Sequence, residues 1–165
     1  MSTQVVLITG GLTGIGRAAA VAFARKGAKV VVAGRRDEAG NALVKELRAL
    51  GSEAEFINAD VRKEDDVRAM VDKTVARFGR LDVAVNNAGT EGKVGPITDQ
   101  TAESYAATFD TNVLGVILSM KHEVRVIFAR QPELYRLRHT QSAIRSVPDF
   151  GRGRDDGAKP REPRR

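Results

Sequence analysis

Short apolar runs rich in β-branched residues alternate with helical segments between Gln4 and Gly89, and this order constrains the fold more than any other feature of the chain. The predicted strands are Gln4–Thr9, Ala28–Gly34, Glu53–Asp60 and Leu81–Gly89. Each interval between them is long enough for a helical crossover, so consecutive strands are expected to run parallel. The sequence therefore predicts an α/β fold, a doubly wound parallel sheet with helices on both faces.

Apolar residues recur at helical spacing in the three intervals, which predicts a buried face for each helix. Asp37 is expected to cap the second helix, and the acidic residues Glu64–Asp66 suit the N-terminus of the third. The predicted faces are Ile15, Ala19, Ala22 and Phe23 for the first helix, Leu43, Leu47 and Leu50 for the second, and Val67, Met70, Val71, Val75 and Phe78 for the third.

Four glycines lie in the stretch Val6–Ala19, where the first strand turns into the first helix. In an open parallel sheet, ligands bind at the carboxyl ends of the strands. A helix N-terminus offers unpaired N–H groups there, and glycines let the backbone approach a phosphate closely. Gly10–Gly16 therefore indicates a dinucleotide-binding loop, although a glycine-rich turn without a ligand is the alternative that this loop alone leaves open.

Four ordered motifs resemble those of the short-chain dehydrogenase/reductase family. Thr9–Gly16 reads Thr-Gly-Gly-Leu-Thr-Gly-Ile-Gly and resembles the family's Thr-Gly-x-x-x-Gly-x-Gly fingerprint. Asp60–Val61 resembles the pair that contacts the adenine ring, Asn86–Gly89 resembles the Asn-Asn-Ala-Gly element, and Asn112 resembles the asparagine of the catalytic set. The resemblance covers residues 4 to 128 and implies a Rossmann-like sheet, incomplete, with about four of the usual seven strands.

Each single motif also has a purely structural interpretation. Asp60 can cap the helix that follows it, Asn86 and Asn87 can form a turn, and Asn112 can be a polar residue of an amphipathic helix. A dinucleotide site explains the four together.

The end of the second strand indicates which dinucleotide is bound. An acidic residue there would bond the ribose 2′-hydroxyl of NAD, whereas this chain has Arg35 and Arg36, which favour the 2′-phosphate of NADP. Thr13 stands where NADP-preferring relatives often carry a basic residue, so NAD stays an alternative cofactor. A second alternative is that Arg35 and Arg36 are only solvated loop residues without a ligand. The predicted cofactor-binding residues are Thr9, Gly10, Thr13, Gly14, Ile15, Gly16, Arg35, Arg36, Asp60, Val61, Asn87, Ala88 and Gly89.

The family's catalytic Ser and Tyr-x-x-x-Lys are not matched in this chain. Tyr105 is followed four residues later by Phe109, and Tyr135 by His139, so neither tyrosine has the lysine that would lower its pKa. Ser142 lies near the expected place of the serine but lacks partners. Asn112 is the one catalytic residue that the resemblance assigns.

Composition separates the chain into two parts. The net charge is +6, and most of it lies beyond residue 128. Residues 1–128 are predicted to form the dinucleotide-binding domain, and residues 129–165 a basic tail rich in Arg, Pro and Gly that is disordered and resembles the product of a shifted reading frame. Tyr135 and Phe150 are the tail's only aromatic residues, so nucleic acid is not an expected partner.

The chain lacks cysteine, and neither histidine has a carboxylate at a recognisable ligand spacing, so no metal site is expected. It also lacks an apolar run long enough to cross a membrane, and the start lacks a signal-peptide pattern, which predicts a cytoplasmic protein without a membrane partner.

Two functions stay open at this point. One is an NAD(P)(H)-dependent oxidoreductase of the short-chain family, acting on a small molecule that the sequence does not identify. The other is a catalytically inactive truncated or frame-shifted chain that binds only a nucleotide or a partner chain. In both cases the fourth strand is expected at an open edge of the sheet, which favours a homo-oligomer or aggregation.

Overall fold

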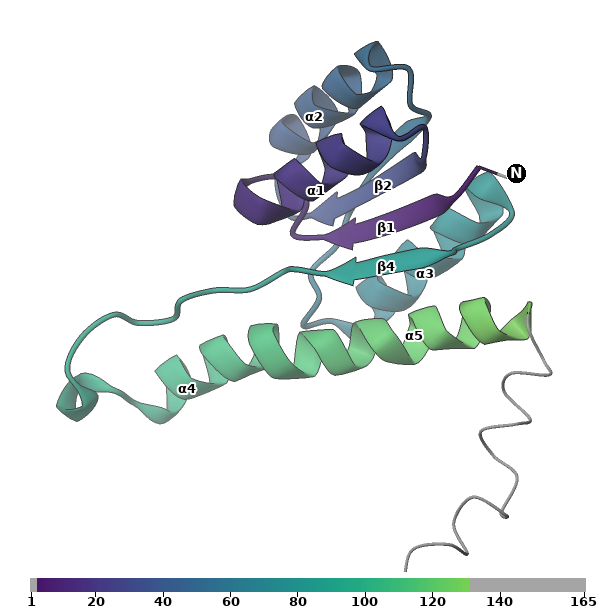
Figure 1. Ribbon diagram of the computed structural model, residues 1–165. Coiled ribbons are helices and arrows are strands. Elements are labelled where there is room, and N and C mark those ends of the chain that lie inside the picture. Colours follow the sequence, from purple (N-terminus) through teal and green to yellow (C-terminus); the bar gives the residue numbers. More distant parts are fainter. Residues whose placement is uncertain (1–2, 131–165) are drawn as a thin grey trace, which may run out of the picture. The chain divides into compact units, whose positions relative to one another are not determined.

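Four parallel strands form one sheet in the order β3-β2-β1-β4 in the computed structural model, which describes residues 3–130 (Figure 1). The strands are β1 (Val5–Thr9), β2 (Lys29–Gly34), β3 (Ala54–Asn58) and β4 (Val83–Asn86). In register, Val6 lies between Val30 of β2 and Val83 of β4. This confirms the predicted Rossmann-like, doubly wound sheet. The predicted boundary at residues 128 and 129, and the tail beyond it, remain predictions because residues 131–165 lie outside the described part.

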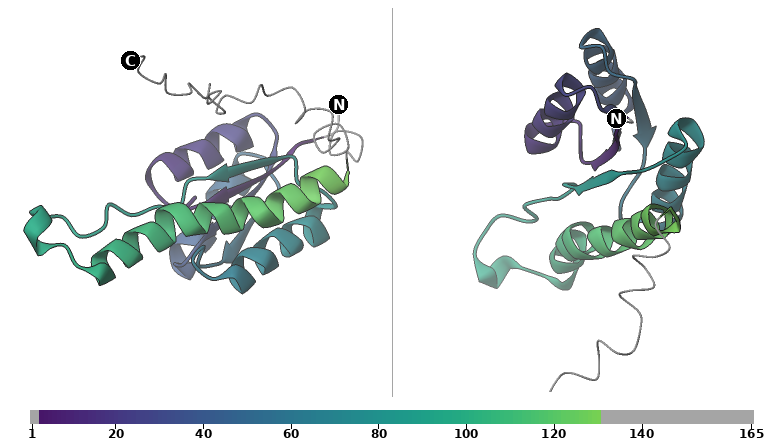
Figure 2. Two further views of the ribbon diagram at one scale, coloured as in Figure 1. Left: turned by 90° about the horizontal axis from the view of Figure 1, so that it is seen from below. Right: turned by 45° about the vertical axis from the view of Figure 1, so that its right-hand side comes forward.

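Helices cover both faces of the sheet (Figures 1 and 2). On one face lie α1 (Gly14–Arg25) and α2 (Asp37–Ala49), and on the other lie α3 (Glu64–Phe78) and α5 (Gly115–Ala129). Between β4 and α5 the chain forms a 3-10 turn η1 (Ile97–Asp99), α4 (Ala102–Phe109) and a π-helical turn η2 (Asp110–Leu114). Figure 2 shows α4, η2 and α5 as one continuous helical segment. Among the described residues, no helix is long and apolar enough to span a membrane.

The alternation of side chains along each strand divides the core into two layers. Val6 and Ile8 of β1 join the layer beneath α1 and α2, whereas Leu7 joins the layer against α3. All three side chains have no exposed surface. Central strands buried on both faces are what continuous apolar runs such as Val5–Thr9 predict.

The predicted buried face of α1 is right in part, because Ala19 and Phe23 are half-buried and pack against the core, whereas Ala22 is exposed. The buried residues of the helix are Gly16, Ala20 and Ala24, whereas Ile15 is 82% exposed. The helix packs so closely that a Cβ atom at Gly16 would overlap the carbonyl oxygen of Gly10. The fully buried positions of α1 therefore carry only glycine and alanine, and the larger Val21 and Phe23 pack at the side of this contact.

Two details of α2 also differ from the prediction. Arg36 occupies the N-cap position without a side-chain cap, and Asp37 is instead the first helical residue, with its carboxylate accepting a 2.6 Å hydrogen bond from the Asn58 side chain. Leu50 follows the helix as its C-cap residue and is 40% exposed. Leu43, Val44 and Leu47 form the buried face, which ends one turn earlier than predicted.

Within residues 3–130, β4 pairs with β1 alone and forms one edge of the sheet. Its four residues are half-buried. An open edge that consists of Val83, Ala84 and Val85 presents unpaired backbone groups beside apolar side chains, a combination that promotes strand pairing between molecules.

We expect the 165-residue chain to associate through this edge, and we expect Ala84→Lys to shift it toward the monomer because a charged side chain on an edge strand disfavours strand pairing. Sedimentation velocity at micromolar concentrations measures the change. Ala76→Lys, at an exposed position of α3, adds the same charge away from the edge and should leave the distribution as it is. A wild-type chain that sediments only as a monomer would contradict the prediction.

Candidate functional site

A cavity of about 310 Å³ opens at the carboxyl ends of the strands. Most of the predicted cofactor-binding residues line it, from four loops of the sheet: Gly10, Thr13, Arg35, Arg36, Asp60, Val61, Asn87, Ala88 and Gly89. Thr9, Gly14, Ile15 and Gly16 are not part of its lining. Sequence analysis missed five lining residues: Leu12, Ala33, Gly34, Ala59 and Thr111.

The glycines of the loop after β1 have different roles. Gly10 has a φ of +63°, and a Cβ atom there would lie 2.7 Å from the Cα atom of Ala88. A Cβ atom at Gly14, where φ is +53°, would meet nothing within 4 Å. Gly10 and Gly16 therefore let the loop pack against its neighbours, and Gly14 leaves open space at the N-terminus of α1.

The N-terminus of α1 suits an anion. Thr13 is the N-cap residue and makes no side-chain cap hydrogen bond, and the first turn contains no acidic residue. The first backbone N–H groups of the helix and the positive end of its dipole therefore lie next to the lining residue Thr13, without a negative side chain in that turn.

The hydroxyl of Thr9 ties the end of β1 to the end of β4. Thr9 is buried, and its Oγ1 accepts hydrogen bonds from the backbone N–H groups of Asn87 (3.1 Å) and Ala88 (3.2 Å). The side chain of Asn87 donates to the carbonyl oxygens of Thr9 (3.3 Å) and Gly10 (3.0 Å). These bonds fix the relative position of the two loops that form one wall of the cavity.

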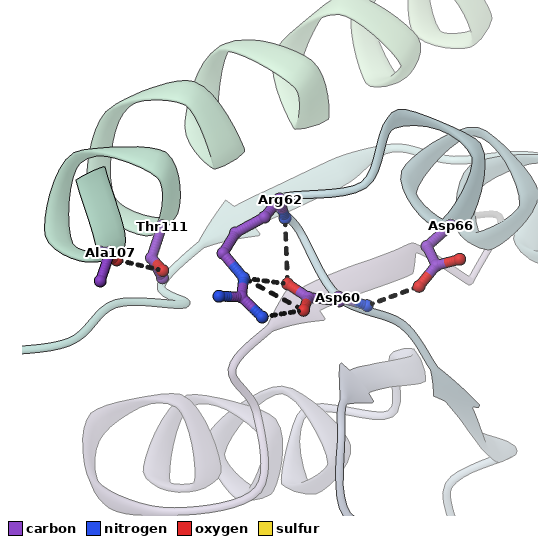
Figure 3. Close-up of polar contacts among 5 residues, drawn as sticks. All are labelled: Asp60, Arg62, Asp66, Ala107 and Thr111. Atoms are coloured by element: carbon purple, nitrogen blue, oxygen red, sulfur yellow. Dashed lines mark hydrogen bonds and ion pairs between the residues drawn. The ribbon is translucent and has the colours of Figure 1, made fainter. Parts of the chain in front are cut away.

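Asp60 lies at the cavity in a tight pair with Arg62, as Figure 3 shows. The Arg62 guanidinium donates to both carboxylate oxygens, with Nε 3.0 Å from Oδ1 and Nη2 2.5 Å from Oδ2. The hydrogen bond from Arg62 lowers the pKa of Asp60 to about 2, and the charge of Arg35 contributes in the same direction. The carboxylate is therefore ionised near neutral pH. Sequence analysis missed Arg62, for which the spacing of two residues from Asp60 was the available signal.

Arg35 and Arg36 follow β2 at the cavity, and both are exposed. Within residues 3–130, neither guanidinium has an ion pair or hydrogen bond. The acidic residue next to them, Asp37, is engaged with Asn58. Two free cationic groups therefore lie at this end of the cavity.

Asn112 lies in η2 and clamps the loop after β4. Its Oδ1 accepts from the backbone N–H of Thr90 and its Nδ2 donates to the carbonyl oxygen of Thr90, both at 2.8 Å. Asn112 itself does not line the cavity, whereas its neighbour Thr111 does. Figure 3 shows Thr111, with its hydroxyl donating to the carbonyl oxygen of Ala107, on the far side of Arg62 from Asp66.

A model of the short chain dehydrogenase family matches residues 4–132. Xanthoxin dehydrogenase of Arabidopsis thaliana is 45% identical over 127 residues, which cover 75% of this chain and 45% of that protein. (+)-Borneol dehydrogenase 2 of Salvia officinalis is 42% identical over 125 residues, which cover 75% of this chain and 44% of that protein. The chain thus spans about half the length of the curated relatives it matches.

Solved structures show the same similarity. A variant of the actinorhodin polyketide ketoreductase, crystallised with NADPH, is 33% identical and superposes with a TM-score of 0.74 over 79% of this chain and 49% of that one. A short chain dehydrogenase/reductase from Burkholderia phymatum, in complex with NAD, is 32% identical with a TM-score of 0.75 over 78% of this chain and 46% of that one.

We expect Asp60→Asn to lower the free energy of unfolding by about 1 kcal/mol at neutral pH, because the charge-assisted bonds to Arg62 are partly exposed. The pKa of Asp60 lies below its ordinary value of 3.8. The stabilisation is therefore fully present when the pH is above 3.8, and it is lost as the pH falls through about 2. Urea unfolding at neutral and acidic pH measures the difference between variant and wild type.

Asp65→Asn is the matched control, because Asp65 also pairs with an arginine but its side chain is 86% exposed. We expect this variant to lower the free energy of unfolding less than Asp60→Asn does. An Asp60→Asn protein that keeps the wild-type stability at neutral pH would show that the pair with Arg62 does not contribute to stability.

Proposed function

The chain belongs to the short-chain dehydrogenase/reductase family, and we propose that residues 3–130 supply the dinucleotide-binding part of an NAD(P)(H)-dependent oxidoreductase. The observation that carries the proposal is the cavity at the strand ends, where the glycine loop, the end of β2 and the Asn87–Gly89 segment meet. The open space at Gly14 and the uncompensated N-terminus of α1 fit a pyrophosphate.

Each wall of the cavity would hold a different part of the dinucleotide. The glycine loop would bind the pyrophosphate through backbone N–H groups. Asp60 and Val61 would bind the adenine end, and Asn87, Ala88 and Gly89 would line the path toward the nicotinamide. The nicotinamide, when bound, exchanges hydride with a substrate; the residues of this part of the chain bind and orient it.

NADP(H) is the cofactor that we propose, with NAD(H) as the weaker ligand. The free guanidiniums of Arg35 and Arg36 can hold a 2′-phosphate in a bidentate arrangement. Asp37 accepts a hydrogen bond from Asn58 and Asp60 pairs with Arg62, so both carboxylates near the cavity already have donors in this conformation. Thr13 brings no basic group, so the preference rests on the two arginines.

We further propose that the 165-residue chain binds the dinucleotide without catalysing hydride transfer. Tyr105 is 61% exposed and its ring stacks on that of Phe109, 4.2 Å between centroids, where a lysine would be needed. Tyr135, Ser142 and Lys159 lie outside the described residues, and their spacing does not match Tyr-x-x-x-Lys. Without a proton donor of lowered pKa, binding supplies orientation alone.

We expect the chain to bind NADPH more tightly than NADH, and Arg35→Asp to weaken NADPH about tenfold or more while sparing NADH, because the 2′-phosphate loses a charged partner and gains a repulsive one. Fluorescence titration of each cofactor measures the dissociation constants. Arg25→Asp, an exposed position at the end of α1 away from the cavity, makes the same charge change as a control. Equal affinities for both cofactors in wild type and in Arg35→Asp would refute the preference.

We expect no NADP(H)-dependent turnover above background with a broad panel of alcohols, sugars, steroids and ketones, because loss of general acid catalysis alone costs about 10²- to 10⁴-fold. Absorbance of the reduced cofactor measures turnover, and a full-length relative assayed in parallel is the positive control. Robust turnover that Asn112→Ala abolishes would reveal an active site in this chain.

A further inference from the structure

A buried polar layer lies where α5 packs against β4, outside the cavity. It consists of Asn86 at the end of β4 and of Ser119 and Glu123, which are one turn apart on the same side of α5. Ser119 is 1% exposed and Glu123 is 3% exposed. The Nδ2 atom of Asn86 donates a 2.8 Å hydrogen bond to Oε2 of Glu123.

The remaining polar atoms of this layer have no hydrogen-bond partner within residues 3–130. They are Oδ1 of Asn86, Oγ of Ser119 and Oε1 of Glu123. An ionised Glu123 would bring only acceptors to a layer that already contains an unpaired amide oxygen. A neutral carboxylic acid would instead add a second O–H donor to that of Ser119, so that the unpaired acceptors of the layer would have two hydroxyl donors rather than one.

We propose that Glu123 is a positioning residue that stays a neutral carboxylic acid, donates its O–H within this layer and, through its bond with Asn86, holds the segment that forms the wall of the dinucleotide cavity. The part of this inference that concerns the cofactor rests on the proposed function. Glu123 itself does not line the cavity, so it acts through Asn86.

The path from Glu123 to the cavity is short. Asn86 is the last residue of β4, and the next three residues, Asn87–Gly89, line the cavity. Thr9 holds this segment from the side of β1 through the backbone N–H groups of Asn87 and Ala88. Glu123 holds it from the side of α5. Loss of the second anchor leaves the end of β4 held by Thr9 alone, with the next hold on the chain being the clamp between Asn112 and Thr90.

The surroundings favour the neutral acid. Burial raises the pKa of Glu123, and the hydrogen bond from Asn86 opposes this only in part. No charged side chain is its hydrogen-bond or ion-pair partner in the described part of the chain. Several charged residues on the elements packed against α5 have other partners. On α3, Glu64 pairs with Lys121 and His122, and Asp72 pairs with Arg125. β4 carries no charged residue, Asp82 before it pairs with Arg80 and Arg130, and Asp110 lies in η2.

The sign of the pH dependence follows from the raised pKa. The neutral form of Glu123 stabilises the fold fully when the pH is below 4.5, the ordinary pKa of a glutamate. This stabilisation is lost as the pH rises through the raised pKa of Glu123. Glu123→Gln has the same shape, keeps an acceptor for Asn86 and supplies an N–H donor that does not titrate. We therefore expect wild type to lose stability relative to Glu123→Gln as the pH rises.

The first test uses the full chain without a cofactor. Urea unfolding between about pH 5 and about pH 9 compares wild type, Glu123→Gln and Glu38→Gln, a surface control on α2 that has no contact with the layer. We expect a flatter profile for Glu123→Gln alone. Infrared spectra should show a carbonyl band of a protonated carboxylic acid that Glu123→Gln removes and Glu38→Gln retains. The proposal would be overturned if the stabilities of wild type and Glu123→Gln changed in parallel with pH and the wild-type spectrum lacked the carbonyl band of a protonated carboxylic acid.

The second test measures NADPH affinity by fluorescence over about pH 6 to about pH 9. Because the 2′-phosphate itself titrates near pH 6, the variants are compared at each pH. Above the pKa of Glu123, the wild-type dissociation constant should rise by up to about tenfold per pH unit relative to that of Glu123→Gln. Glu123→Leu should bind more weakly at every pH, and if it does not fold, the Gln comparison decides.

The two tests separate the inference from the proposed function. A chain that binds no NADPH but shows the protonated band and the flattened Glu123→Gln profile would contradict the proposed function and support the neutral Glu123. A chain that binds NADPH with the same pH profile in wild type and Glu123→Gln would support the proposed function and overturn the positioning role.

Discussion

The hydroxyl of Thr9 is the contact on which the arrangement of the site depends. It joins the carboxyl ends of β1 and β4, which come from distant parts of the sequence. Its oxygen accepts hydrogen bonds from the backbone N–H groups of Asn87 and Ala88, in the turn after β4. The same turn lies against Gly10 so closely that a Cβ atom there would be 2.7 Å from the Cα of Ala88. The glycine loop therefore has its shape because the turn after β4 is packed against it, and neither loop holds this position alone.

This arrangement explains why a motif residue is not always a lining residue. Thr9 and Gly16 belong to the fingerprint that identifies the family, yet they serve the packing of the loop beneath the cavity. Gly10 and Thr13 of the same fingerprint line the cavity. Substitution of the first group would act on a bound cofactor through the backbone, whereas substitution of the second would act on it by direct contact.

Sequence periodicity was sufficient for the strands and for the order of elements, because buried parallel strands are continuous apolar runs and their crossovers are amphipathic helices. In α1 it gave the half-buried Ala19 and Phe23 correctly and was wrong for Ile15, because close approach to the sheet selects Gly16, Ala20 and Ala24 for the fully buried positions. It also did not reveal the buried Glu123 or the Asp60–Arg62 pair, for which the spacing of two residues was the one available signal. A glutamate in a helix next to a lysine and a histidine has the pattern of a solvated face, and only the packing of α5 on β4 shows that it is buried.

The proposed separation of binding from catalysis has its basis in two parts of the structure that are held by different contacts. Among the described residues, most of those that line the cavity follow the four strands, and hydrogen bonds of Thr9 and Asn87 join the loops after β1 and β4. The helical segment of α4, η2 and α5 exposes large apolar side chains: Phe109 is 45% exposed, Ile117 is 57% exposed and Met120 is 51% exposed. Apolar side chains exposed along α4 and α5, together with the open edge of β4, form a surface that stabilises the fold only when something covers it. The clamp between Asn112 and Thr90 and the pair between Asn86 and Glu123 are the side-chain bonds that join this helical segment to the chain that forms the cavity wall.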